Sequence, residues 1–239
     1  MITPAIQIVE ETGSTNADLV ATVRTGQARE GQWLVARQQT AGRGRQGREW
    51  FDGSGNFMGS TLVGLGTPDP APATLSFVAA LAVHDAVEEA LMHASHASLK
   101  WPNDVLLGGG KLSGILLELV ETHVVVGIGV NLKRAPELAD RRTSAVADHG
   151  PAPSLEWFAD RLALCFARRL TIWREKGLAA VLTAFLDLSV HRSGSPVTVH
   201  DTDGSRVEGA FVGLDETDGA LRLRLADGSE RVIRAGDIL

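Results

Sequence analysis

The sequence predicts an α/β (α+β) chain in which a larger mixed domain precedes a small all-β domain. One long amphipathic helix pattern lies in the first half of the chain. Three strand-like segments then follow one another with connections too short for helical crossovers, which favours antiparallel pairing. Beyond residue 191, three Asp-Gly pairs separate short alternating apolar segments, a pattern typical of hairpins in a small β-barrel.

The composition is that of a folded globular protein. A chain of 239 residues is long enough for one large domain with its own core and a small second domain. The formal net charge of -6 argues against a nucleic-acid binder, which usually carries a basic balance. The N-terminus lacks the features of a signal peptide, and the most apolar helix candidate is too polar to span a bilayer. The expected location is therefore the cytoplasm.

Short strand patterns and one capped helix make up the beginning of the chain. Ser14 is a typical N-cap residue, and it predicts a helix that starts near Asn16. A polar, glycine-rich stretch over residues 40–56 is predicted to be a loop. The segments with strand character are residues 5–9, 32–37 and 57–65.

Three further helices are predicted from apolar spacing. Thr74 is expected to cap a helix that runs to about residue 91 and buries one face. Ser154 is expected to open a helix that runs to about residue 174, and another helix is predicted near residues 178–188. Between them, the three meander strands are predicted over residues 98–107, 111–121 and 123–132, with reversals at Gly108-Gly109-Gly110 and Glu121-Thr122.

A change of texture near residues 189–194 predicts the domain boundary, so that residues 1–190 form the larger domain and residues 191–239 the barrel. The predicted hairpin turns are Asp203-Gly204, Asp218-Gly219 and Asp227-Gly228. The apolar positions expected to fill the barrel are Val197, Val199, Val207, Phe211, Leu221, Leu223, Leu225 and Val232.

The most informative segment is the Gly/Arg loop, residues 42–50, which opens with three glycines and three arginines over seven residues. Glycine lets a backbone approach a ligand closely, and arginine offers a planar charged fork that matches carboxylates and phosphates. The composition therefore predicts that the loop closes over an anionic ligand and is mobile when no ligand is bound. Its GxGxxG spacing does not predict a Rossmann site, because no helix pattern follows. A solvated loop or a weak RNA contact stays open as an alternative.

A second cluster of polar residues surrounds the first reversal of the meander. A hairpin is expected to hold Asp104 and Lys111 on neighbouring strands, where the lysine can stabilise charge on a phosphoryl group. The simpler alternatives are a surface ion pair between them and a core position for Trp101. Gly127 and Gly129 weaken the strand in which they lie, so a ligand, a bulge or a packed helix must need the space.

These motifs occur together and in order, and with them the chain resembles the bacterial biotin–protein ligases, in the monofunctional form without an N-terminal DNA-binding domain. The matching residues are Ser14-Thr15-Asn16, GRGRQGREW over 42–50, KWPND over 100–104, KLSGILLE over 111–118 and GIGVN over 127–131. The resemblance implies a mixed curved sheet flanked by helices, as in class II aminoacyl-tRNA synthetases and biotin ligases, followed by an SH3-like barrel.

The resemblance also implies a reaction: ATP-dependent ligation of biotin to an acceptor lysine through biotinyl-5'-AMP, with release of pyrophosphate and with Mg2+ bound to ATP. The implied catalytic residues are Lys111, Arg43 and Arg45. The implied biotin-binding residues are Ser14, Thr15, Asn16, Gln39, Gly42, Arg43, Gly44, Arg45, Lys111, Gly114, Leu116 and Gly129. The implied ATP-binding residues are Arg43, Arg45, Arg48, Trp50, Asn103, Asp104, Lys111 and Asn131.

The implied partner is the biotin acceptor domain of a carboxylase, namely its biotin carboxyl carrier protein, with no DNA and no membrane; a homodimer stays open. Gln46 and Thr40 depart from residues frequent in the family. Arg224 falls where some members have an acidic residue, which puts the contact between barrel and active site in doubt.

Three other functions are weighed against this one. A bifunctional ligase and repressor needs a helix-turn-helix, for which the 13 residues before Ser14 are too few. A lipoate or octanoate enzyme is disfavoured by the polar residues at 14–16, and a thermal-shift assay with biotin against lipoate separates the two. A non-catalytic binding module is the third, and pyrophosphate release that depends on biotin would exclude it.

Cys165 is expected to be a buried apolar residue, and the seven histidines show no zinc spacing, so no structural metal is expected.

Overall fold

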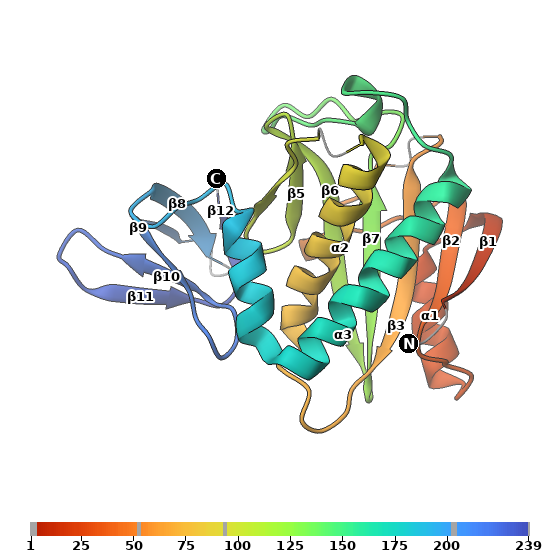
Figure 1. Ribbon diagram of the computed structural model, residues 1–239, viewed down its shortest axis with the longest axis horizontal. Helices are drawn as coiled ribbons and strands as arrows, with labels where there is room; N and C mark the ends of the chain where they lie inside the picture. Colours follow the sequence, from red (N-terminus) through yellow and green to blue (C-terminus); the bar gives the residue numbers. More distant parts are fainter. Residues whose placement is uncertain (1–3, 52–53, 93–94, 202–204, 239) are drawn as a thin grey trace.

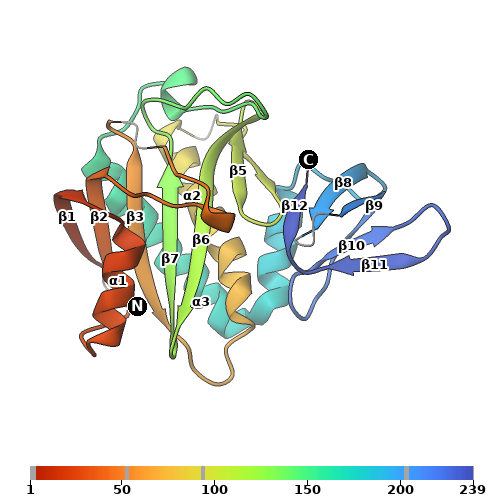
Figure 2. The same ribbon diagram turned by 180° about the vertical axis from the view of Figure 1, so that it is seen from behind.

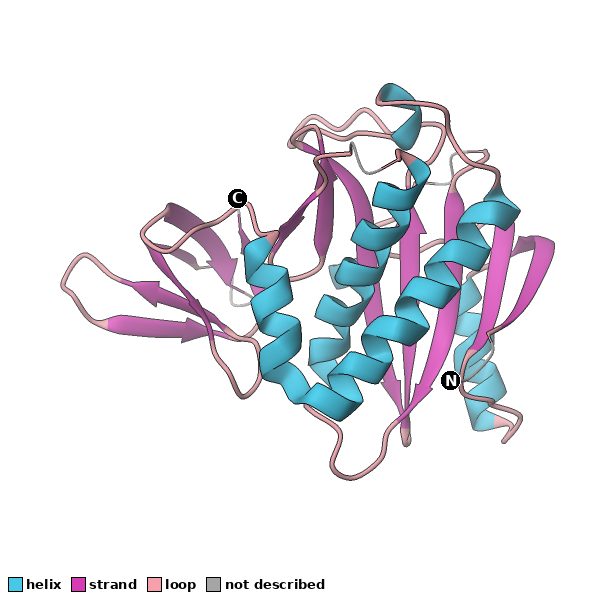
Figure 3. Cartoon of the chain, in the orientation of Figure 1, coloured by secondary structure: helices cyan, strands magenta, loops and turns pink. Residues whose placement is uncertain are grey.

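The protein consists of a seven-stranded sheet covered by helices and a separate five-stranded antiparallel sheet (Figures 1 and 3). The computed structural model describes residues 4–51, 54–92, 95–201 and 205–238. Helices α2 and α3 cover one face of the large sheet, and α1 lies on the opposite face (Figures 1 and 2). The predicted α/β class is thus confirmed, and the smaller sheet forms a barrel-like domain.

The large sheet has the strand order β1-β2-β3-β7-β6-β5-β4. Its strands are β1 (Ala5–Thr12), β2 (Gln32–Gln39), β3 (Phe57–Gly64), β4 (Ser98–Lys100), β5 (Asp104–Leu107), β6 (Gly110–Val120) and β7 (His123–Val130). Only β1 and β2 pair in parallel among the described strands, and α1 connects them. The antiparallel meander β5-β6-β7 is the one predicted from the two short connections.

The prediction of one strand over residues 98–107 is wrong, because the chain folds back on itself there. β4 and β5 form a hairpin in which Lys100 pairs with Asp104, and the intervening turn contains a cis peptide bond before Pro102. Proline has no N–H for a ladder hydrogen bond, so a central strand cannot continue through it. The hairpin places Asn103 and Asp104 at the end of the sheet near β6.

Helix α1 (Thr15–Arg24) begins as predicted, with the Ser14 hydroxyl accepting a hydrogen bond from the Ala17 N–H at 3.5 Å. Thr74 occupies the predicted N-cap position of α2, but its side chain makes no capping hydrogen bond. Thr74 has helical backbone angles at the end of a 3-10 turn, and its hydroxyl accepts the indole N–H of Trp173 at 2.8 Å. That bond links α2 (Leu75–Ala90) to α3 and so satisfies a buried polar group in the core.

Helix α3 (Leu155–Asp187) combines the two helices predicted over residues 154–174 and 178–188. It bends at Gly177, whose φ of 73° lies in the left-handed region that glycine adopts without strain. Arg169 donates two hydrogen bonds, of 2.8 and 2.7 Å, to Asp85 on α2. Cys165 is buried between the same helices, as predicted.

The smaller sheet has the order β11-β10-β9-β8-β12. Its strands are β8 (Pro196–Asp201), β9 (Arg206–Leu214), β10 (Leu221–Arg224), β11 (Glu230–Ile233) and β12 (Gly236–Ile238). The predicted turns Asp218-Gly219 and Asp227-Gly228 are confirmed, and Asp203-Gly204 lies outside the described residues. The inward position predicted for Val232 is wrong, because the register pairs Ile233 with buried Leu221 and leaves Val232 40% exposed.

The two sheets are joined by hydrogen bonds as well as by the chain. The Trp101 indole N–H donates to the Gly219 carbonyl of the barrel turn at 3.0 Å, which confirms a buried position for this tryptophan. Leu99 of β4 exchanges backbone hydrogen bonds with Leu188 and Val190 at the end of α3. Within the described ranges, no helix combines the length and apolar character needed to cross a membrane.

Candidate active site

A cavity of about 660 Å³ opens on the α1 face of the large sheet. The Gly/Arg loop crosses this face above β6 and β7, as Figure 2 shows. Sixteen of the residues proposed from the sequence line the cavity: Ser14, Thr15, Asn16, Gln39, Gly42, Arg43, Gly44, Arg45, Arg48, Trp50, Asn103, Lys111, Gly114, Leu116, Gly129 and Asn131. Asp104 does not line it but pairs with Lys111 beside it.

One end of the cavity is built from a chain of neutral hydrogen-bonding groups. The Gln39 side-chain carbonyl accepts from the Thr15 backbone N–H at 2.8 Å and from the Thr15 hydroxyl at 3.1 Å. The Thr15 hydroxyl lies 2.7 Å from the Ser60 hydroxyl, which donates to the Asn16 side-chain carbonyl at 2.6 Å. The Asn16 amide in turn donates to Glu118 at 2.7 Å. Each of these groups is therefore oriented before a ligand arrives.

The two glycines of β7 leave space for side chains that lie on the sheet. A Cβ at Gly127 would meet the Asn16 side-chain oxygen at 2.1 Å, and a Cβ at Gly129 would meet the Trp50 ring at 2.2 Å. Gly129 pairs with Gly114 of β6, where a Cβ would lie 2.9 Å from the same ring. The glycines thus keep these positions of the cavity floor free of side chains, and the Trp50 ring rests there.

The other end of the cavity is cationic. Lys111 Nζ lies 2.6 Å from Asp104 Oδ1, and the two side chains are 20% and 18% exposed. The hairpin geometry predicted for this pair is confirmed. The ion pair named as the simpler alternative also forms, with both side chains partly buried and not fully at the surface. Burial lowers the pKa of the nearby Lys100 amine, and the charge of Asp104 opposes that shift only in part. Asn131 donates to the Ser144 carbonyl at 3.1 Å and so holds the segment that follows β7.

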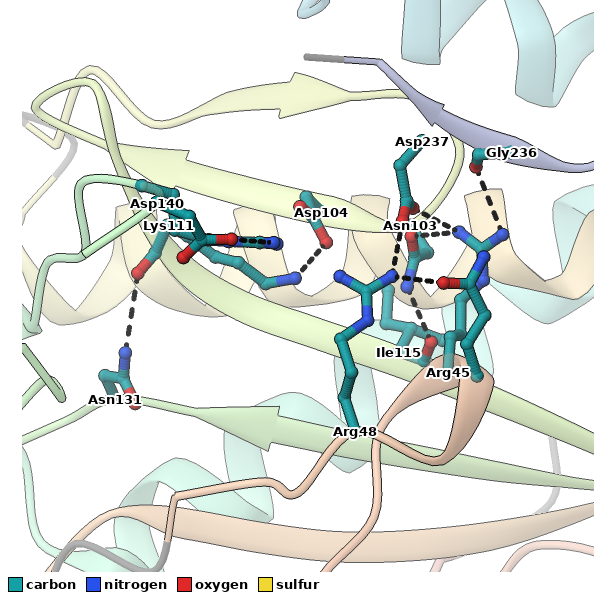
Figure 4. A network of polar contacts seen from close by, with 12 residues as sticks. Arg45, Arg48, Asn103, Asp104, Lys111, Ile115, Asn131, Asp140, Gly236 and Asp237 are labelled. Atoms are coloured by element: carbon teal, nitrogen blue, oxygen red, sulfur yellow. Dashed lines mark hydrogen bonds and ion pairs between the residues drawn. The ribbon is translucent and has the colours of Figure 1, made fainter. Parts of the chain in front are cut away.

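The arginines of the Gly/Arg loop reach the barrel (Figure 4). Arg45 donates to Asn103 Oδ1 at 2.8 Å and contacts Asp237 of β12 at 3.3 Å, and Arg48 donates to the same carboxylate. Burial raises the pKa of the Asp237 carboxyl, but the hydrogen bond from Arg48 and the charges of Arg45, Arg48 and Lys111 outweigh it, so the pKa lies below its usual value. Asp237 is therefore an anion at neutral pH.

A family model described as the biotin/lipoate A/B protein ligase family matches residues 9–131, and one described as the biotin protein ligase C terminal domain matches residues 193–239. The chain belongs to this ligase family. Among its curated relatives are two biotin–[acetyl-CoA-carboxylase] ligases. The one from Paracoccus denitrificans is 40% identical over 97% of this chain and 98% of its own length. The one from Mycobacterium tuberculosis is 37% identical over 98% and 88%.

The ligase fold is also seen in a solved structure of the biotin protein ligase from Aquifex aeolicus in complex with biotin and ATP. It superposes with a TM-score of 0.84 at 26% identity, covering 98% of this chain and 97% of that chain. The mixed sheet and the barrel-like domain that the resemblance implied are therefore the architecture of the ligase family.

Several residues that line this ligase cavity escaped the sequence analysis. Ser60 lies in the middle of β3 in a sequence with no polar motif around it. Glu118, the last residue of the matching run on β6, accepts a hydrogen bond from Asn16 but does not itself line the cavity. Asp140 and Arg141, which form an ion pair at 2.6 Å, come from the loop after β7. Asp237 comes from the barrel. Arg224, the barrel position at which some family members have an acidic residue, instead pairs with Glu230 on the β10–β11 hairpin.

The Gly/Arg loop of this ligase has a defined backbone. Its two arms pair between Arg43 and Glu49, and the Trp50 N–H donates to the Gly42 carbonyl at 3.1 Å. A Cβ at Gly42 would lie 3.0 Å from the Gln39 amide, so glycine lets the loop start against the neutral end of the cavity. Among the described residues, no group of three histidines, cysteines, aspartates or glutamates has the arrangement of a metal site.

Proposed function

We propose that the chain is a biotin–protein ligase, which joins biotin to ATP as biotinyl-adenylate and then transfers the biotin to a lysine of an acceptor protein. The observation that carries this proposal is that one cavity has a neutral hydrogen-bonding end and a cationic end, separated by a floor of paired glycines. Biotin has the same order of groups, with a neutral ureido ring, an apolar chain and a carboxylate.

The neutral end suits a ureido group better than a plain acyl chain. A ureido ring has one carbonyl acceptor and two N–H donors, and Thr15, Asn16 and Ser60 offer hydroxyl and amide groups of both kinds within a buried region. These groups already bond to one another, but an acyl chain would offer nothing to the donors and acceptors that remain, and a buried polar group left unsatisfied costs about 1–3 kcal/mol. The arrangement therefore favours biotin over lipoate or octanoate as the acid.

The cationic end fits the first half-reaction. One oxygen of the biotin carboxylate attacks the α-phosphorus of ATP, the bond to the bridging oxygen breaks, and pyrophosphate leaves with the electron pair. Two anions must meet, so positive charge has to be in place beforehand, and Arg43, Arg45 and Lys111 supply it from two sides of the cavity. Mg2+ bound to ATP screens the phosphate oxygens and needs few protein ligands.

The second half-reaction consumes the mixed anhydride. The acceptor lysine amine attacks the acyl carbon, AMP leaves, and the nitrogen loses a proton to form the amide. The Gly/Arg loop lines the cavity and keeps water from the anhydride until the acceptor arrives. The names of the curated relatives support the biotin acceptor domain of acetyl-CoA carboxylase as the acceptor.

Release of pyrophosphate from ATP on addition of biotin is the decisive test of the proposed function. We expect release to require biotin, to stop after about one turnover without acceptor, and to resume when a carrier domain is added. Lipoate at the same concentration serves as the control acid. Release that is equal with lipoate, or that does not depend on any acid, contradicts the proposal.

Replacing Ser60 with alanine should weaken biotin binding by about tenfold, which corresponds to loss of one buried hydrogen bond of roughly 1.4 kcal/mol. Ser60 is fully buried and bridges Thr15 to Asn16, so its loss leaves each of them with one fewer hydrogen bond to fix its orientation. Titration calorimetry with biotin measures the change. Ser76→Ala, on α2 across the sheet, is the control, and equal affinity in both variants would show that Ser60 does not orient the site.

Arg45→Ala should allow the adenylate to leak. Arg45 ties the Gly/Arg loop to Asn103 at 2.8 Å and to the barrel carbonyl of Gly236 at 3.2 Å, so its loss unfastens the loop from both supports. We expect hydrolysis of the intermediate to rise about tenfold, as water gains access. Single-turnover assays with labelled ATP separate adenylate from free AMP. A half-life equal to that of the parent chain would contradict a gating loop.

A further inference from the structure

The Asp237 carboxylate lies at the meeting point of three parts of the molecule. It belongs to β12 of the barrel, it contacts Arg45 and Arg48 of the Gly/Arg loop, and it lines the cavity of the large sheet. Figure 4 shows the two guanidinium groups turned toward this one carboxylate. Its side chain is 31% exposed, so solvent screens the pairs only in part.

We propose that Asp237 is a positioning residue of the ligase, which holds the two loop arginines where the phosphates of ATP bind. This inference rests on the proposed function and deepens it. It makes the barrel part of the machinery that adenylates the acid and retains the adenylate. Asp237 itself takes no part in the bond changes.

The need for such a residue follows from the charges. Arg45 and Arg48 approach the same point, and two like charges at close range repel one another unless an anion lies between them. Asp237 is that anion, and β12 is anchored by its pairing with β8. The carboxylate is therefore placed by the barrel and not by the loop that it holds.

The arginines keep donors free for a ligand while they are held. Arg48 uses Nη2 for both Asp237 and Gln46, and none of its bonds to described residues involves Nε or Nη1. Arg45 is fixed from the sheet side by Asn103, whose own amide donates to the Ile115 carbonyl at 2.8 Å. The clamp thus holds both guanidinium groups at the cavity. It leaves Nε and Nη1 of Arg48 to bind phosphate, whereas both terminal nitrogens of Arg45 are used for Asn103, Asp237 and Gly236.

The opposite role would give the opposite result. If Asp237 acted as a competitor that occupies the place of a phosphate, its removal would strengthen ATP binding. If it positions the arginines, its removal lets the Gly/Arg loop separate from the barrel and weakens ATP binding. The Michaelis constant for ATP therefore distinguishes the two roles by its direction.

The test compares Asp237→Ala, Asp237→Asn and Asp237→Glu in the full chain. For Asp237→Ala we expect the KM for ATP and the rate of adenylate loss to rise about tenfold, with the KM for biotin changed less than about twofold. Asp237→Glu keeps the charge, so its KM for ATP and its rate of adenylate loss should lie near those of the parent chain. Asp237→Asn should give values between those of Asp237→Glu and Asp237→Ala. The matched control is Glu230→Ala, since Glu230 also bridges two barrel arginines, Arg222 at 2.6 Å and Arg224 at 3.2 Å.

Two outcomes overturn the proposal: a KM for ATP that falls or stays constant in Asp237→Ala, and an equal rise in Glu230→Ala. An Arg48→Ala background guards against a general loss of structure. If Asp237 acts through the arginines, Asp237→Ala raises the KM for ATP by a smaller factor in the Arg48→Ala background than in the parent chain. An equal factor in both backgrounds contradicts the mechanism. Biotin-dependent pyrophosphate release by the parent chain tests the proposed function separately, so its failure is not confused with a failure of Asp237.

Discussion

Replacing Lys111 with alanine is expected to lower biotin-dependent pyrophosphate release by about 10²–10³-fold while the chain stays folded. Lys111 opens β6 and extends into the cavity, where its amine is the cation contributed by the sheet itself. The Gly/Arg loop supplies the other cations from above. Alanine removes the ammonium group that stabilises the negative charge developing at the α-phosphate. Arg45 and Arg48 cannot move into its place because they are held at Asn103 and Asp237.

The fold should survive because the pair lies at the edge of the cavity and not in the core. Asp104 loses its partner at 2.6 Å, which costs about 1–3 kcal/mol. Single-turnover adenylation measures the activity, and thermal melting measures the fold. Lys176→Ala, at an exposed position of α3, is the control. Adenylation at the parental rate in Lys111→Ala would remove this lysine from the mechanism.

Adding one methyl group at Gly129 is expected to abolish adenylate formation by at least about 10²-fold. A Cβ there would lie 2.2 Å from the Trp50 ring, so the indole has to leave the floor of the cavity. Gly129 faces Gly114 across β6 and β7, and the methyl group would push the indole from the glycine pair into the space between the neutral and cationic ends. Both half-sites would persist, but the acid could no longer reach from one to the other.

Calorimetry with biotin and a single-turnover assay together check this prediction. Gly13→Ala is the matched control, because the same methyl group at Gly13 would meet nothing within 4 Å. Melting temperatures of the two variants should agree closely, since Trp50 belongs to a loop and can move without opening the core. Retained biotin affinity and retained adenylation in Gly129→Ala would show that the glycine pair is not the ligand path.

The sequence predicted the parts of this site that are local in the chain. Ser14 as a helix cap, the Gly/Arg loop, and the neighbouring positions of Asp104 and Lys111 each follow from residue chemistry or from a short hairpin. Apolar periodicity predicted the helices and the meander for the same reason. The error near Pro102 and the missing capping bond at Thr74 arose where a buried tertiary contact or a proline turn overrode the local pattern.

The parts that could not be predicted depend on contacts between distant segments. Ser60 bonds to Asn16 across 44 positions, and Arg48 bonds to Asp237 across 189. A serine within a buried strand and an aspartate within a barrel strand have no distinguishing neighbours in the sequence. Their roles exist only because the sheet and the barrel bring them to the cavity, so a fold is needed before either can be proposed.

The position of Trp50 has an optical consequence. Its indole N–H is buried and has no hydrogen-bond acceptor among the described residues, whereas the indoles of Trp101 and Trp173 donate to a carbonyl and a hydroxyl in the core. The ring rests on the cavity floor, so whatever enters the cavity changes the polarity around it. The share of the tryptophan fluorescence that comes from Trp50 therefore reports occupancy of the cavity with no dye attached, above the signal of the four other tryptophans.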